Sequence, residues 1–179
     1  VALCGSRICP GGNWEKGVFG VEEEIFYRSS ANMAFSDETR GGFYILQDDA
    51  VLYAPQIFLY RKSAAEKFDM DKSGGGFFSM ITVAPQHMDS DCKELSDEQR
   101  ETLKNKFRNV IQTALYWGHD SIVMNPFGDG VPGNYPAAEV TAIIKHVVFA
   151  KKLMFCTRLK QLVIVFPITD TPSPALPIY

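Results

Sequence analysis

Residues 10–30 read Pro-Gly-Gly-Asn-Trp-Glu-Lys-Gly-Val-Phe-Gly-Val-Glu-Glu-Glu-Ile-Phe-Tyr-Arg-Ser-Ser, a glycine-rich loop followed by a helix that opens on three acidic residues. Glycine lacks a Cβ and adopts positive φ readily, so the backbone of this loop can approach a ligand closely. The carboxyl groups that follow can serve as an acid or a base. The stretch therefore predicts a site in which a loop holds a ligand and a helix supplies the chemistry.

A purely structural interpretation also fits these residues. Acidic side chains are common in the first turn of a helix because the helix dipole favours negative charge there. Neighbouring helical residues point about 100° apart, so Glu22, Glu23 and Glu24 cannot all face one pocket. Taken alone, the stretch leaves open both whether it is a site and which carboxyl group faces inward.

The composition predicts one domain over residues 1–179, since the chain is 46% apolar and 22% charged. The net charge of −3 excludes a global basic field for nucleic acid, so an anionic ligand must be bound through backbone N–H groups. No apolar run reaches membrane-spanning length. The four cysteines show no metal-binding spacing, so we expect no metal. We also expect no cofactor and a monomer. A reducing compartment is expected for such cysteines, which means a cytoplasmic or nuclear location.

Short apolar runs alternate with amphipathic stretches along the chain, which predicts an α/β fold. We expect a surface loop at 31–42. Strands are expected at 1–4, 43–46, 56–60, 77–83, 121–124 and 159–168. Helices are expected from about 19 to 30, from a capping box at Ser96 and Gln99 to a stop at Gly118, and from 136 to about 151.

A second glycine-rich stretch, residues 125–136, reads Asn-Pro-Phe-Gly-Asp-Gly-Val-Pro-Gly-Asn-Tyr-Pro. It precedes a helix whose first N–H groups favour a phosphate. Like the first stretch, it follows a predicted strand, and ligand loops of α/β folds collect at the carboxyl ends of strands. We therefore expect the two stretches to meet in one crevice.

The first stretch resembles the signature of the microbial-type poly(ADP-ribose) glycohydrolases, a branch of the macrodomain fold. That family has a Gly-Gly-Gly loop, a spacer, and Gln-Glu-Glu at the start of a helix. Here Gly11 and Gly12 match the loop, with Asn13 in place of its third glycine. Glu22 and Glu23 match the paired glutamates.

The second stretch resembles the family's Gly-Cys-Gly-Val-Phe loop, which wraps the pyrophosphate of ADP-ribose. An aromatic residue of that loop contacts the distal ribose; Pro132 replaces it here, and Phe127 is a candidate to compensate. The residues assigned to this loop are Phe127, Gly128, Asp129, Gly130 and Val131.

The resemblance implies a macrodomain-like three-layer α/β/α sandwich with a mixed central sheet. It implies an ADP-ribosyl glycohydrolase in which Glu23 is the general acid/base and Glu22 raises its proton affinity. Its partners would be ADP-ribose and ADP-ribosylated protein or polymer. Departures at Asn13, Val21, Asp129 and Pro132 favour the alternative of a non-catalytic ADP-ribose reader, and a hydrolase of another ADP-ribosyl metabolite is a third possibility.

Overall fold

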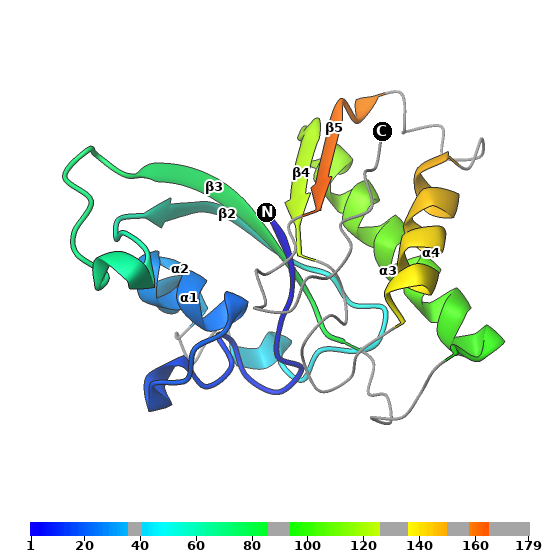
Figure 1. Ribbon diagram of the computed structural model, residues 1–179, viewed down its shortest axis with the longest axis horizontal. Helices are drawn as coiled ribbons and strands as arrows, with labels where there is room; N and C mark the ends of the chain where they lie inside the picture. The colour runs from blue at the N-terminus through cyan, green and yellow to red at the C-terminus, as the bar shows by residue number, and fades with distance from the viewer. Residues whose placement is uncertain (36–40, 86–93, 126–135, 150–157, 165–179) are drawn as a thin grey trace.

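The computed structural model describes residues 1–35, 41–85, 94–125, 136–149 and 158–164 (Figure 1). Within them the strands are β1 (Ala2–Cys4), β2 (Leu52–Leu59), β3 (Gly76–Val83), β4 (Ser121–Met124) and β5 (Gln161–Ile164). The α-helices are α1 (Val21–Arg28), α2 (Ala31–Phe35), α3 (Asp97–Tyr116) and α4 (Ala137–Phe149). Short 3₁₀ helices are η1 (Trp14–Lys16), η2 (Gly41–Phe43) and η3 (Ala64–Glu66).

The strands form one sheet in the order β2-β3-β1-β4-β5. β1 lies at its centre and runs parallel to both β3 and β4, β5 runs parallel to β4, and β2 is antiparallel to β3 at the edge. The sheet is therefore mixed, with four parallel strands whose carboxyl ends share one edge.

The two faces of the sheet carry separate hydrophobic cores. Ala2 of β1 belongs to the core under α3 and α4, whereas the next residue, Leu3, belongs to the core under α1 and α2. Successive strand residues point to opposite faces, so this alternation places one pair of helices on each side (Figure 1). The arrangement is the expected three-layer α/β/α sandwich.

Strands at 77–83 and 121–124 agree with the sequence prediction, but the predicted strand at 43–46 is wrong. That segment begins at the last residue of η2 and is irregular after it. Phe43 and Ile45 have side chains typical of strands, but both are exposed rather than packed in a sheet. The predicted loop at 31–42 instead begins with α2, because Ala31 packs into the core.

β2 begins at Leu52, four residues before the predicted start. The register shifts between Ala54 and Ile57, where Gln56 has a φ of 56°. Pro55 has no N–H to donate, and an interruption of this kind is tolerated at a sheet edge.

Helix α3 begins at the capping box that the sequence predicts. The hydroxyl of Ser96 accepts from the N–H of Gln99 at 3.2 Å, and Oε1 of Gln99 accepts from the N–H of Ser96 at 2.8 Å. Leu103, Phe107 and Val110 then lie on one buried face. None of the helices in the described residues combines the length and apolar character that crossing a membrane requires.

Replacing Ser96 with alanine should lower the free energy of unfolding by about 1 kcal/mol, because one N–H of the first turn loses its acceptor. Urea denaturation measures the loss. Ser63→Ala is the matched control, since Ser63 precedes η3 without a capping hydrogen bond from its side chain. Equal losses in the two variants would contradict the role of the cap.

Candidate functional site

The carboxyl ends of the central strands bring three segments of the chain together. The N–H of Gly5, just after β1, donates to the carbonyl of Val83 at the end of β3 at 2.9 Å. On the other side of β1, the N–H of Cys4 donates to Oδ1 of Asn125 at 3.0 Å. The chain passes from β3 to β4 across β1, and such a reversal of strand order is where α/β folds bind ligands.

The first glycine-rich stretch begins at this edge of the sheet, and the side chain of Glu22 is hydrogen-bonded to the backbone there. The N–H of Ser6 donates to Oε2 of Glu22 at 2.6 Å, and the N–H of Gly11 donates to Oε1 at 3.0 Å. The Glu22 residue is only 7% exposed. A Cβ on Gly5 would lie 2.8 Å from Oε1 of Glu22, so the close approach requires glycine.

Burial raises the pKa of Glu22 to about 7. The hydrogen bonds from Ser6 and Gly11 favour the ionised form and oppose this rise, whereas the negative charge of Glu23 adds to it. Near neutral pH the carboxyl group of Glu22 therefore exists in both its neutral and its ionised forms.

Glu23 is half-buried against the same loop. Its Oε1 accepts from the N–H of Asn13 at 3.2 Å. A Cβ on Gly12 would lie 2.4 Å from Oε1, and one on Gly20 would lie 2.4 Å from Oε2. The carboxyl group of Glu23 is therefore enclosed by the backbone of two glycines, and Gly12 also needs its φ of 59°.

Glu24 faces a different direction from the other two acids. It forms an ion pair with Arg28 at 3.0 Å, one turn along α1. Glu22 and Glu23 are thus the two acids that hold the loop.

Three consecutive N–H groups of this loop are used within the protein. Those of Gly11 and Asn13 donate to Glu22 and Glu23, and that of Gly12 donates to the carbonyl of Cys9 at 3.3 Å. The sequence predicted that such groups would bind an anion, and in this structure they bind carboxylates of the chain itself. The second predicted loop, Phe127–Val131, lies outside the described residues, and the structure places only its neighbour Asn125 at this edge.

Arg7 also fixes the loop, and the sequence analysis missed it. Its guanidinium donates to the carbonyls of Leu46 and Pro85, each at 3.2 Å, and forms an ion pair with Asp48. Hydrogen bonding to Arg7 lowers the pKa of Asp48. These partners lie 39 to 78 residues away in sequence, so no local pattern reveals them.

Lys106 is a second residue that the sequence analysis missed. It is 1% exposed, and its Nζ donates to the carbonyl of Ala84, just after β3, at 2.6 Å. Burial lowers its pKa. A signal was available, because Lys106 falls three residues after Leu103 and four before Val110, on the apolar face of α3.

Tyr44 lies close enough to the loop for its pKa to respond to it. Burial raises the pKa of the phenol, and the nearby carboxyl group of Glu22 raises it further. The irregular segment at 43–46 therefore lines the same edge as the paired glutamates.

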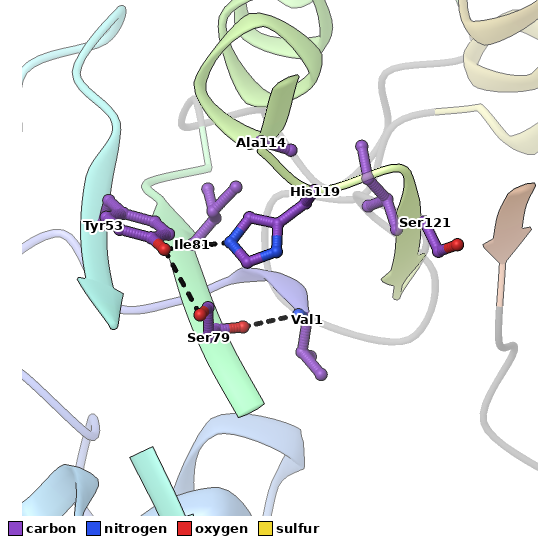
Figure 2. A pocket seen from close by; sticks show the side chains of 8 residues that line it. Val1, Tyr53, Ser79, Ile81, Ala114, His119 and Ser121 are labelled. Atoms are coloured by element: carbon purple, nitrogen blue, oxygen red, sulfur yellow. Dashed lines mark hydrogen bonds between the residues drawn. The ribbon is translucent and has the colours of Figure 1, made fainter. Parts of the chain in front are cut away.

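A separate cavity of about 190 Å³ lies at the opposite edge of the sheet, beside Val1 at the start of β1 (Figure 2). The hydroxyl of Tyr53 is hydrogen-bonded to Nε2 of His119 at 2.9 Å and donates to Oγ of Ser79 at 3.3 Å. Trp117, directly after the end of α3, stacks on Tyr53 with ring centroids 4.9 Å apart. This cavity shares none of the loop residues described above.

Among the described residues, no three His, Cys, Asp or Glu side chains gather as metal ligands would. The two glutamates and the glycine loop therefore make up the candidate site as the structure describes it.

The raised pKa of Glu22 predicts a specific dependence of stability on pH. A carboxyl group whose pKa is higher in the folded than in the unfolded state binds more protons when the protein is folded. Its contribution to the free energy of unfolding is therefore present below about pH 4.5 and is lost as pH rises to about 7. The difference in unfolding free energy between the native protein and Glu22→Gln should fall by about 3 kcal/mol over this window. Urea denaturation at several pH values measures it, and a constant difference would contradict the assignment.

Comparison with known proteins agrees with this architecture. No protein-family model and no curated protein matches the chain. Among solved structures, the poly(ADP-ribose) glycohydrolase of Deinococcus radiodurans in complex with ADP-ribose superposes with a TM-score of 0.72 and 18% identity. That of Thermomonospora curvata gives 0.71 and 20%, and a macrodomain of Oceanobacillus iheyensis gives 0.58 and 15%.

These alignments cover 92%, 91% and 92% of this chain, respectively, and 76% of the macrodomain. The chain spans only 66% and 61% of the two glycohydrolases. The resemblance inferred from the paired glutamates and glycine loops is thus confirmed at the level of the fold: the chain has the macrodomain-type fold of the bacterial poly(ADP-ribose) glycohydrolases.

Proposed function

We propose that the protein is an ADP-ribosyl glycohydrolase that releases ADP-ribose from poly(ADP-ribose) or from ADP-ribosylated protein, with Glu23 as its general acid/base. The observation that carries this proposal is the arrangement of two consecutive glutamates around one glycine loop, one of them buried and the other half-buried. The solved neighbours support the ligand class, since one glycohydrolase was solved with ADP-ribose and another with the inhibitor ADP-HPD.

The chemistry requires one well-placed carboxyl group. The bond between the anomeric carbon of ribose and the leaving oxygen breaks through an oxocarbenium-like transition state, so an acid must protonate that oxygen. Glu23 would donate this proton and, once ionised, would accept a proton from the water that adds to the anomeric carbon. The reaction consumes one water molecule for each ADP-ribose released.

Glu22 is suited to a supporting role. Both of its oxygens accept from the backbone, and its burial leaves it little contact with a substrate. That Glu22 raises the proton affinity of Glu23 is part of this proposal, and burial raises the pKa of Glu22 itself to about 7. Glu22 thus fixes the loop that positions Glu23.

The diphosphate of ADP-ribose needs hydrogen-bond donors. Since the N–H groups of Gly11, Gly12 and Asn13 are used internally, we assign these residues to close contact with the ribose through their backbone. The pyrophosphate is assigned to the second loop, at Gly128–Val131, which precedes α4 and follows Asn125.

Glu23→Gln tests the catalytic role. Loss of a general acid should slow the release of ADP-ribose by about 100- to 10,000-fold, whereas the isosteric side chain should leave the affinity for ADP-ribose nearly unchanged. Activity on ADP-ribosylated polymer and protein, with calorimetric titration of ADP-ribose, measures both effects.

Glu24→Gln is the matched control and should retain activity, because Glu24 pairs with Arg28 rather than with the loop. Undiminished turnover by Glu23→Gln would remove Glu23 from the role. A native protein that binds ADP-ribose and retains modified substrate without releasing it would be the reader instead.

Gly12→Ala tests the position of the carboxyl group rather than its chemistry. The new Cβ would displace Oε1 of Glu23, the mobile end of a side chain. We therefore expect a modest loss of stability from the positive φ, about 1 kcal/mol, and a fall in turnover of about 100-fold.

Gly17→Ala has the same backbone cost, at a φ of 77°, but its Cβ would meet nothing within 4 Å. It should lose similar stability and keep its activity. Equal turnover in the two alanine variants would show that a Cβ at residue 12 does not disturb the catalytic position of the Glu23 carboxyl group.

A further inference from the structure

The segment that leads from β1 into the glycine loop carries a hydroxyl and a thiol that the mechanism above does not use. The hydroxyl of Ser6 accepts from the N–H of Ile8 at 3.2 Å and from the N–H of Cys9 at 3.3 Å. The half-buried thiol of Cys9 lies 3.8 Å from this hydroxyl and donates to the carbonyl of Gly12 at 3.1 Å. The N–H of Gly12 donates in turn to the carbonyl of Cys9 at 3.3 Å. Residues 6–12 are therefore closed on themselves by side-chain and backbone hydrogen bonds.

One peptide group of the loop is held at both of its ends. The peptide group between Gly12 and Asn13 has its carbonyl on Gly12 and its N–H on Asn13, and these point in opposite directions because a trans peptide group is planar. The carbonyl accepts from the thiol of Cys9, and the N–H donates to Oε1 of Glu23 at 3.2 Å. The orientation of this one plane therefore decides whether a donor faces Glu23.

The backbone alone does not fix that orientation. Gly11 and Gly12 have φ angles of 74° and 59°, and glycine populates positive and negative φ about equally well. If the plane turned over, the carbonyl oxygen of Gly12 would face the carboxyl group of Glu23 in place of the N–H. The thiol of Cys9 opposes this rotation because it binds that oxygen on the opposite side of the plane.

We propose that Cys9, supported by Ser6, is a positioning residue for the reaction: its thiol holds the peptide group between Gly12 and Asn13 so that the N–H faces Glu23. This inference rests on the proposed function. The N–H of Ser6 also donates to Oε2 of Glu22 at 2.6 Å, so the same short segment orients both glutamates. Cys9 acts through the peptide group and does not itself react.

Cys9→Ala and Cys9→Ser test the thiol, because serine restores a hydrogen-bond donor that alanine lacks. Cys9→Ala should lower kcat by about tenfold or more, since a displacement of about 1 Å can cost about 100-fold, whereas KM and the affinity for ADP-ribose stay the same. Cys9→Ser should restore most of the native kcat. A native kcat in Cys9→Ala, or a Cys9→Ser variant as slow as Cys9→Ala, would overturn the proposal.

Ser6→Ala and Ser6→Thr test the supporting hydroxyl. Alanine removes the acceptor of two backbone N–H groups and should lower kcat, whereas threonine keeps the acceptor and should retain it. Ser73→Ala is the matched control, because the hydroxyl of Ser73 also closes a turn, by donating to Oδ1 of Asp71 at 2.6 Å, between β2 and β3. It should keep the native kcat. Equal losses in Ser6→Ala and Ser73→Ala, or in Ser6→Ala and Ser6→Thr, would refute the role of Ser6.

Amide hydrogen exchange, measured by NMR, separates this inference from the proposed function because it needs no turnover. The N–H of Asn13 should exchange several-fold faster in Cys9→Ala than in the native protein and in Cys9→Ser. The N–H of Gln99, in the capping box of α3, is the reference and should be unchanged. Unchanged exchange at Asn13 would overturn the proposal whatever the activity. Absence of ADP-ribose release by the native protein would refute the glycohydrolase function, while faster exchange at Asn13 would still support the hold of Cys9 on the peptide group.

Discussion

The candidate site depends on one buried carboxyl group, that of Glu22, which accepts hydrogen bonds from the backbone of Ser6 and Gly11. Burying a carboxyl group is unfavourable unless its oxygens are hydrogen-bonded. The loop supplies those donors, and in return the carboxyl group determines the path of the loop. Because Glu22 opens α1, the same contact also fixes the start of this helix relative to the end of β1.

The central position of β1 explains why the site forms at this edge. It pairs with β3 through all three of its residues and with β4 at Ala2, so the segment that follows lies between the ends of β3 and β4. Arg7 and Lys106 then bind the carbonyls of Pro85 and Ala84. Arg7 therefore holds the segment after β3 against the loop, and Lys106 holds it against α3, so the edge is fixed from elements far apart in the sequence.

Sequence patterns predicted those parts of the molecule that depend on local interactions. The capping box at Ser96 and the apolar run at 121–124 each contain their own signal, and the structure agrees with both. The segment at 43–46 also has strand-forming residues, but pairing requires a neighbouring strand, and among the described residues no strand pairs with it. Arg7 was missed because its partners are also distant in sequence: they come from the segment just after β3 and from the segment at 46–48.

Within the site, the sequence placed two acids beside a glycine loop but could not say how they differ. Consecutive residues on a helix point in different directions. The side chain of Glu22 therefore contacts Ser6 and Gly11, and that of Glu23 contacts Asn13. Burial raises the pKa of Glu22, and both of its oxygens accept from backbone N–H groups, whereas Glu23 is half-buried and accepts from the N–H of Asn13. The N–H groups of Ser6, Gly11 and Asn13 thus hold the carboxyl groups of two consecutive glutamates against the glycine loop.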